Sequence, residues 1–214
     1  MLINGKISYQ ELEQLIFLLR EKIINSYLKK VYHYENLWLF KFNHFSFTFD
    51  PGVTIWPGNF LEREKIIHSV CVKIRKEVGD NKIVDLNLVN KDRTVIIKFK
   101  NNYKIILELF AKGNLILIDE CNKISVLTRT YNDFIHGKTY SLNESEYKDF
   151  DNDFEIIPYI VNRVKREVIK HENVKDCEKE NENISTNCNI MTCLEELWCI
   201  KKSESIKKTE KKKK

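Results

Sequence analysis

Residues 92–119, which read DRTVIIKFKNNYKIILELFAKGNLILID, decide the fold. Runs rich in Val, Ile, Leu and Phe are separated there by short polar turns, first Asn-Asn at 101–102 and then Lys-Gly-Asn at 112–114. This pattern predicts a two-residue hairpin turn at the first position and a second turn before LILID. A third turn, ECNK at 120–123, leads into ISVLTRT. Four successive hairpin-linked strands predict an antiparallel meander within a strand-rich region, 82–129.

The residues before this region predict two helices and further strands. Apolar residues recur at helical spacing over 8–25, and again over 60–78, where Gly79 is the expected stop. Between the helices, 27–50 contains three short aromatic-rich strand patterns, and Pro-Gly at 51–52 predicts a turn. The expected fold class is therefore α+β, an antiparallel meander or sandwich with two packing helices.

The last third of the chain is more polar. We expect a folded domain over 1–142, an acidic link with a short helical extension over 143–200, and a lysine-rich tail over 201–214. Helical patterns near 156–170 and 190–200 make this extension partly helical.

The formal net charge of +5 is concentrated at one end of the chain. The last fourteen residues hold eight Lys and two Glu, so the rest of the chain is nearly neutral. A neutral body with a polylysine end is typical of a protein whose tail meets a polyanion such as RNA, although a solubilising end has the same composition. The tail residues expected to bind RNA are Lys207, Lys208, Lys211, Lys212, Lys213 and Lys214.

The expected compartment is the cytoplasm. An apolar share of 43% favours a packed core over general disorder. No apolar run approaches the roughly 20 residues that span a bilayer, and the opening MLINGK lacks the apolar core of a signal peptide. We therefore expect no membrane partner.

The six cysteines are expected to be free thiols in a reducing compartment. Cys71 and Cys121 fall within the predicted regular elements, where they would pack as small apolar side chains. The remaining four contain one Cys-x4-Cys spacing but no second knuckle and no paired His, so no metal is predicted and the possibility of one stays open. These four are Cys177, Cys188, Cys193 and Cys199.

The stretch from Asp92 to Asp119 resembles the N-terminal domain of the NFACT family. This family includes ribosome quality-control factors of the large ribosomal subunit, nuclear export mediator factors and fibronectin-binding-like proteins. The resemblance rests on the Asp-Arg strand, on LELF at 107–110 and on AKGNLILID at 111–119. Supporting matches are ISYQEL, IRK at 74–76 and GKTYSL, so that the similarity covers residues 6–142.

The resemblance implies a glycosylase-like fold without glycosylase chemistry. Such glycosylases use an N-terminal Pro-Glu pair, whereas this chain begins Met-Leu-Ile, so we expect a non-catalytic protein without a cofactor. Compared with the family, the chain is expected to be a short form without the coiled coil and C-terminal domains. Thr54, Trp56 and Glu77 replace an Arg and two His of the family patterns.

The first candidate site residues are Asp92, Arg93 and Glu11. The resemblance implies that the Asp-Arg pair lies near the tRNA acceptor end, and a guanidinium fork suits phosphate. The alternative is a strand-end charge pair, worth at most about 1 kcal/mol when exposed. The resemblance also implies a functional acid at Glu11, although a capping box with Ser8 explains that residue without a ligand.

Further RNA-binding candidates are Lys73, Arg75 and Lys76, expected on one face of the second helix, and Arg129 on the last strand. A solvated helix face explains the first three equally well. Gly113 and Asn114 are expected to be turn residues with positive φ. The five histidines have no shared spacing that would indicate a metal site or a general base.

The first functional hypothesis is a ribosome-binding protein that occupies the tRNA region of the large subunit, as a monomer, and silences translation as a hibernation or dormancy factor. A second is a ribosome quality-control factor that binds stalled large subunits with peptidyl-tRNA. A third is a general RNA- or tRNA-binding module, whose binding would depend strongly on salt and little on RNA identity. A nucleic-acid enzyme is disfavoured because the glycosylase residues are missing.

Overall fold

The computed structural model describes residues 6–58, 68–89, 92–131 and 135–141. Within them the fold is α+β, as predicted. The predictions for 143–214, which include the link, both extension helices, the last four cysteines and the lysine tail, lie outside the described residues. The elements are α1 (Tyr9–Ile23), β1 (Leu28–Tyr34), β2 (Leu37–Phe42), β3 (Ser46–Asp50), β4 (Thr54–Pro57), α2 (Ser69–Val78), β5 (Ile83–Leu88), β6 (Thr94–Phe99), β7 (Lys104–Glu108), β8 (Asn114–Ile118) and β9 (Ile124–Leu127).

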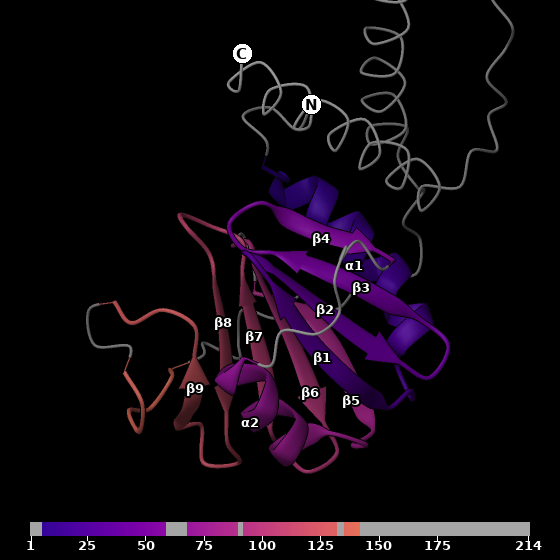
Figure 1. Ribbon diagram of the computed structural model, residues 1–214. Coiled ribbons are helices and arrows are strands. Elements are labelled where there is room, and N and C mark those ends of the chain that lie inside the picture. Colours follow the sequence, from indigo (N-terminus) through magenta and orange to yellow (C-terminus); the bar gives the residue numbers. More distant parts are fainter. Residues whose placement is uncertain (1–5, 59–67, 90–91, 132–134, 142–214) are drawn as a thin grey trace, which may run out of the picture. The chain divides into compact units, whose positions relative to one another are not determined.

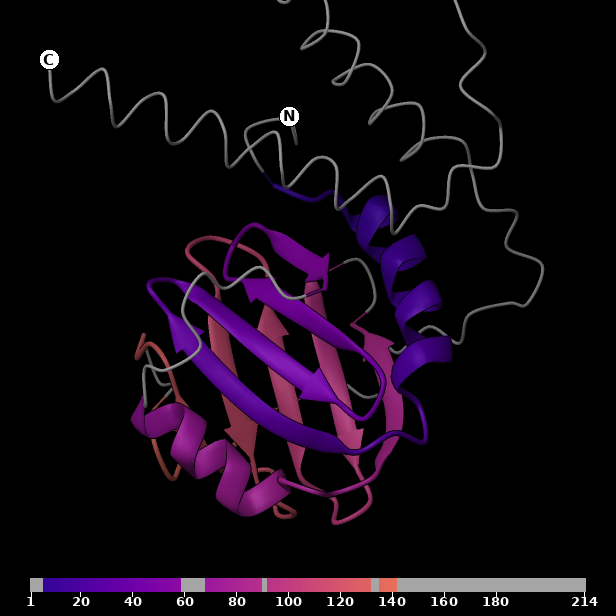
Figure 2. The same ribbon diagram turned by 45° about the vertical axis from the view of Figure 1, so that its right-hand side comes forward.

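The strands form two antiparallel sheets that lie face to face (Figures 1 and 2). The first has the order β1-β2-β3-β4 and the second the order β5-β6-β7-β8-β9, so each sheet is a meander. The sequence predicted β1–β3 and β6–β9 and placed β5 within a strand-rich region, but it missed β4, which is only four residues long and ends at Pro57. Because strands that are consecutive within each sheet are also neighbours, the turns gather at the two ends of the sheets.

Each helix contacts a different part of the sheets. α1 packs against β5, and its predicted capping box is present, because Ser8 N donates to Glu11 Oε2 at 2.8 Å and Glu11 N donates to Ser8 Oγ at 3.2 Å. α2 contacts β1 and β9, one strand of each sheet. The prediction of one helix over 60–78 is wrong at His68, whose extended backbone makes it the N-cap of α2.

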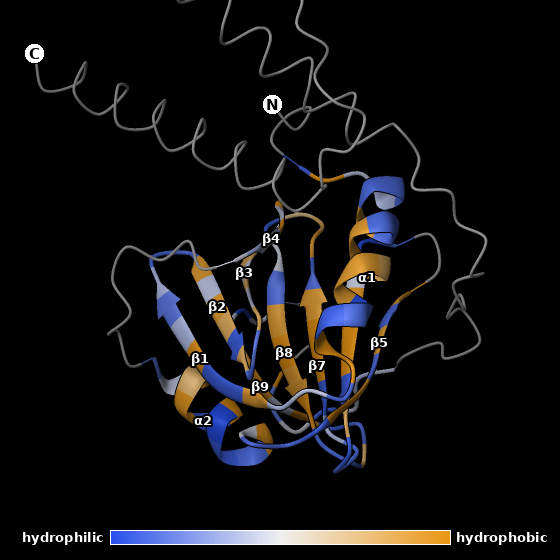
Figure 3. Ribbon diagram, turned by 90° about the vertical axis from the view of Figure 1, so that its right-hand side faces the viewer, coloured by the Kyte–Doolittle hydropathy of each residue, from blue (hydrophilic) through white to orange (hydrophobic). Residues whose placement is uncertain are grey.

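The core lies on both faces of the second sheet. Ile96, Ile106 and Ile116 are in register across β6, β7 and β8, and they pack with Tyr140 on one face. All five residues of β8 are buried. In Figure 3 β7 and β8 are largely hydrophobic along their length, whereas β1 is largely hydrophilic. Full burial of each such aliphatic side chain stabilises the fold by about 1.5–3 kcal/mol.

Three local predictions need correction or a new reason. The predicted two-residue turn between β6 and β7 is a three-residue loop, Lys100 to Asn102, because Phe99 N donates to Tyr103 O. Within the Asn pair only Asn102 has a positive φ, 64°. Cys121 is exposed in the turn after β8, while Cys71 is buried as expected. Gly79 does end α2, because its ψ of 138° leaves the helical region. Glycine is needed there because a Cβ would lie 2.2 Å from Arg75 O, not because of positive φ.

Candidate nucleic-acid interface

The two sheets touch through glycine backbones at one end of the domain. Gly52 in the β3–β4 turn has φ +72°, and Gly113 in the β7–β8 turn has φ +71°. A Cβ on Gly113 would lie 2.1 Å from Gly52 N, and one on Gly52 would lie 2.8 Å from Ala111 O. Only glycine at both positions allows this approach, so the Gly-Asn motif of the sequence has a structural reason.

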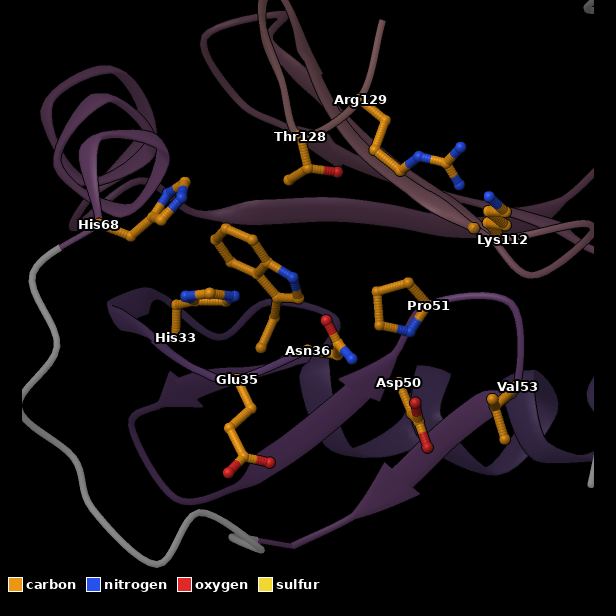
Figure 4. Close-up of a pocket in the computed structure, with 12 residues that line it drawn as sticks. His33, Glu35, Asn36, Asp50, Pro51, Val53, His68, Lys112, Thr128 and Arg129 are labelled. Atoms are coloured by element: carbon orange, nitrogen blue, oxygen red, sulfur yellow. The ribbon is translucent and has the colours of Figure 1, made fainter. Parts of the chain in front are cut away.

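A cavity of about 670 Å³ opens beside this contact. Its wall comes from the β1–β2 and β3–β4 turns of the first sheet, the start of α2, the β7–β8 turn and the end of β9 (Figure 4). Both sheets therefore contribute to one concave site at the end where their turns converge. The lining residues are His33, Glu35, Asn36, Trp38, Asp50, Pro51, Val53, His68, Lys112, Gly113, Thr128 and Arg129.

One side of the cavity is an aromatic cluster formed by His33, Trp38 and His68. The ring centroids of His33 and Trp38, which face each other across β1 and β2, are 4.1 Å apart. The His33 and His68 centroids are 4.7 Å apart, and His68 meets Trp38 edge-on at 5.2 Å. His68 is fixed because its Nδ1 accepts from Val70 N at 3.2 Å, which caps α2.

The His33 imidazole is held in its neutral form. Burial lowers its pKa from the usual 6.5, the nearby His68 lowers it further, and a backbone interaction with Glu35 opposes the shift. The lowered pKa favours the uncharged imidazole on the aromatic side of the cavity.

The other side of the cavity is cationic. Lys112 and Arg129 are both exposed, and in Figure 4 the Arg129 guanidinium points toward Lys112. The Arg129 backbone is fixed by Asn114, whose Nδ2 donates to Arg129 O at 2.9 Å and whose Oδ1 accepts from Arg129 N at 3.1 Å. Asn114 is buried in β8 and has no positive φ, so the turn role predicted for it is wrong. Its side chain instead positions Arg129.

The Asp92-Arg93 pair makes internal contacts, and both residues are half-buried. Asp92 Oδ1 accepts from Arg93 N at 2.6 Å, and Asp92 Oδ2 accepts from Thr94 Oγ1 at 3.2 Å. Arg93 Nη1 donates to Ile7 O at 3.1 Å, and so ties the start of β6 to the segment before α1. These contacts give the pair a structural role, and its predicted contact with RNA stays a prediction.

A buried polar row crosses the second sheet beside this pair. We call Thr94, Glu108 and Asn114 the polar row, because they are in register across β6, β7 and β8 and each is at most 3% exposed. Tyr131 and Tyr140 donate their hydroxyls to Glu108 Oε1 at 2.8 and 3.1 Å. Burial raises the pKa of Glu108, the two phenols oppose this, and the charge of Asp92 adds to it.

The other predicted site residues do not form one surface. Arg75 donates through Nε and Nη2 to Val31 O and lies over the Tyr32 ring, 4.9 Å from its centroid. Lys73 pairs with Glu77 at 3.0 Å, and Lys76 is exposed. The prediction that Lys73, Arg75 and Lys76 share one helix face is therefore wrong, since Arg75 packs against the first sheet. Glu11 is 3% exposed and serves the capping box.

The sequence identified only Arg129 among the residues that line the cavity. His33 and Trp38 could have been found from the β1–β2 hairpin, because residues close to its turn pair across the strands. No sequence pattern relates them to His68, which is brought in by α2.

The described residues contain no group of three His, Cys, Asp or Glu side chains arranged to hold a metal ion. In the same residues, no helix combines the length and the apolar character that a membrane span requires.

Comparison with known proteins supports the resemblance seen in the sequence. No protein-family model matches the chain. The chain is 36% identical over 59 residues to ribosome quality control complex subunit 2 of Saccharomyces cerevisiae. This match covers 27% of the chain and only 6% of the yeast protein, so it concerns a small part of that protein.

Solved structures give a match to the fold. The N-terminal domain of fibronectin-binding protein PavA from Streptococcus pneumoniae has a TM-score of 0.55 at 17% identity, over 93% of this chain and 85% of that chain. The N-terminal part of the fibronectin/fibrinogen-binding protein from Streptococcus suis has a TM-score of 0.54 at 16% identity, over 61% and 59%. The predicted resemblance to the NFACT N-terminal domain is thus confirmed, and the α+β fold matches these neighbours.

Proposed function

We propose that this chain is a non-catalytic, cytoplasmic, ribosome-associated protein that binds RNA in the tRNA region of the large subunit and silences translation by occupying it. The observation that carries the proposal is the sequence match to a subunit of the yeast ribosome quality control complex, on a fold of the same type that the resemblance predicts. Occupying a site needs affinity and a fitting shape but no turnover, and a small folded domain can supply both.

The geometry of the cavity end supports binding to RNA. Lys112 and Arg129 place two exposed cations at one concave site, and Arg is suited to bidentate contact with phosphate. The lysine-rich tail adds a second source of attraction to a polyanion.

One hydroxyl in the wall of the cavity, that of Thr128, is engaged by the fold. Thr128 Oγ1 donates to Asn114 Oδ1 at 2.8 Å and accepts from Leu115 N at 3.1 Å, so this hydroxyl is held within the strand pairing. A nucleophile would instead need its hydroxyl proton directed at a base.

Co-sedimentation of the full chain with purified ribosomal subunits, at low and moderate salt, tests the proposal. We expect binding to the large subunit that persists at moderate salt, and inhibition of peptide synthesis when the protein saturates intact ribosomes. Binding that disappears with salt and does not distinguish the subunits would reduce the chain to a general RNA binder.

The second candidate, a quality-control role, is favoured by the name of the yeast relative. It predicts preferential binding to large subunits that carry peptidyl-tRNA over empty ones. Occupancy predicts the reverse order, because peptidyl-tRNA would compete for the same site. Sedimentation with both kinds of subunit therefore separates the two roles.

A further inference from the structure

The two sides of the cavity differ in chemistry, and both face the same space. We propose that this cavity binds one unstacked nucleotide, with the phosphate at Lys112 and Arg129 and the base against the cluster of His33, Trp38 and His68. The inference deepens the proposed function and rests on it for the source of the nucleotide, which would be an RNA strand.

The size of the cavity fits this class of ligand. Its volume of about 670 Å³ lies within the range of about 300–1,000 Å³ typical of sites for small ligands. Such sites are usually mostly apolar with a few polar groups that fix orientation. Here Trp38, Pro51 and Val53 provide apolar wall, and the cations stand at one side.

The aromatic cluster is suited to a nucleobase because it is preformed, with His33 and His68 half-buried and so accessible and Trp38 buried among them. Three rings from β1, β2 and the N-cap of α2 are in mutual contact, with centroids 4.1 to 5.2 Å apart. Stacking on aromatic rings accepts any base, since every base has a π-face. The site should therefore bind nucleotides with little preference among the four bases.

The charges are arranged for a phosphate, although two carboxylates also line the cavity. Glu35 and Asp50 point away from the space between the histidines and the cations in Figure 4. Asp50 is also engaged by Trp56, whose Nε1 donates to Asp50 Oδ2 at 3.4 Å. The second sheet contributes two charged residues to the cavity wall, Lys112 and Arg129, and both are positive.

The backbones that carry the two cations are fixed by contacts within the fold, so less backbone order has to be gained on binding. The Gly52–Gly113 contact fixes the turn that carries Lys112, and the Asn114 side chain fixes the backbone of Arg129. The turn that carries Lys112 is thereby joined to the first sheet, which provides His33 and Trp38.

The test measures binding of labelled hexa-adenylate and hexa-uridylate by fluorescence anisotropy, and of AMP by quenching of tryptophan fluorescence. The full chain is compared with Lys112→Ala/Arg129→Ala, with His33→Leu, and with Lys100→Ala/Lys123→Ala. This last variant removes the same charge from exposed lysines in the turns at the opposite end of the second sheet. Measurements at about 0.15 M salt, where the Debye length is about 8 Å, screen the attraction of exposed charges that lie farther than this from the bound phosphate.

We expect hexanucleotide affinity to fall about tenfold in the first two variants and to change less than twofold in the third. If AMP also binds and is weakened by the same two variants, the site accepts a free nucleotide. If only the hexanucleotides bind, the ligand is a nucleotide within an RNA strand. Equal losses in both double variants, unchanged affinity in the first two, or no binding of any probe would overturn the proposal. All three variants can also be sedimented with ribosomal subunits. If the nucleotide-binding test fails but the chain still binds the large subunit, only the proposal for the cavity is overturned and the proposed function stays intact.

Discussion

Gly113 is one of the two glycines whose backbones meet where the two sheets come into contact. Replacing it with Ala places a methyl group 2.1 Å from Gly52 N, in a backbone conformation with φ +71°. We expect Gly113→Ala to lower the free energy of unfolding by about 3 kcal/mol, because strain and backbone overlap act together. Urea unfolding monitored by circular dichroism measures this decrease.

Gly137→Ala is the matched control for that substitution. Gly137 also has a positive φ, +81°, but nothing lies within 4 Å of its added Cβ. It should cost only the backbone strain, about 1 kcal/mol. Equal destabilisation at both positions would show that the contact between the two turns does not matter for stability.

Glu108 gives the fold a pH dependence whose sign follows from its burial. Burial raises the pKa of Glu108 in the folded state above the usual 4.5. Below about pH 4.5 the carboxyl is neutral in both the folded and the unfolded state, so it does not disfavour folding. As the pH rises through the folded-state pKa, the buried carboxyl must ionise and the stability of the fold decreases. Glu108→Gln keeps an acceptor for Tyr131 and Tyr140 but removes the charge. We expect the stability of the variant relative to the wild type to increase from about pH 4 to about pH 8, as measured by urea unfolding at each pH; a constant difference would contradict this.

Residues whose roles depend on near neighbours were the ones that the sequence predicted well. The Ser8–Glu11 capping box and the positive φ of Gly113 depend on a few consecutive residues, and both are present. The cluster of His33 with His68 joins residues from β1 and from the start of α2, which are distant in the sequence, so no local pattern reveals it. Arg93 was interpreted as a displayed cation because its partner, Ile7 O, lies 86 residues away and is a backbone atom.

At the scale of elements, the segment before α1 is held to both sheets by three hydrogen bonds. Ile7 N donates to Val53 O, Arg93 Nη1 donates to Ile7 O, and Lys6 Nζ donates to Ala111 O. Arg93→Ala should accelerate hydrogen exchange of the Ile7 amide and of the first turn of α1 about tenfold, because a half-buried charged donor is removed. Exchange measured by NMR tests this prediction.

Lys6→Ala removes a donor to the same junction and serves as the comparison. Its hydrogen bond to Ala111 O is exposed, so we expect exchange to change less than about threefold. If Arg93→Ala instead leaves exchange unchanged while RNA binding falls, Arg93 is a ligand contact and not a structural residue.

The elements that the sequence placed correctly are those with strong periodicity. The hairpins β6–β9 alternate long apolar runs with polar turns, and their buried positions match that pattern. β4 was missed because four residues ending in proline have no measurable period. The start of α2 was misplaced because His68 caps it with a side chain rarely used for that purpose, in place of Ser, Thr, Asp or Asn.

At the scale of the whole molecule, the motifs behind the resemblance converge on one end of the described domain. Asp92-Arg93 directly precedes β6, Glu108 of LELF ends β7, and Gly113 precedes Asn114, the first residue of β8. Antiparallel pairing brings these three points together, and the polar row links them. The motifs therefore build the frame of this end. Of the candidate ligand-binding residues, Lys112 belongs to the AKGNLILID motif, whereas others such as His33 and Arg129 lie beside the motifs and outside them.

This arrangement predicts that the tail contributes affinity for any RNA, whereas the cavity contributes the preference for the large subunit. Replacing Lys211 to Lys214 with Gln in the full chain should weaken binding to any RNA and make it less dependent on salt. The slope of log K against the logarithm of the salt concentration should become shallower by up to about 0.7 for each single-strand phosphate that the tail no longer neutralises. The preference for the large subunit over unrelated RNA should remain. Lys112→Ala/Arg129→Ala should lower the slope by at most about 1.4 but reduce that preference, because the proposed cavity accepts only an unstacked nucleotide, whereas the tail attracts any phosphate. Sedimentation across a salt series, with unrelated RNA as competitor, measures both quantities; a preference that disappears in the tail variant alone would place recognition in the tail and not in the folded domain.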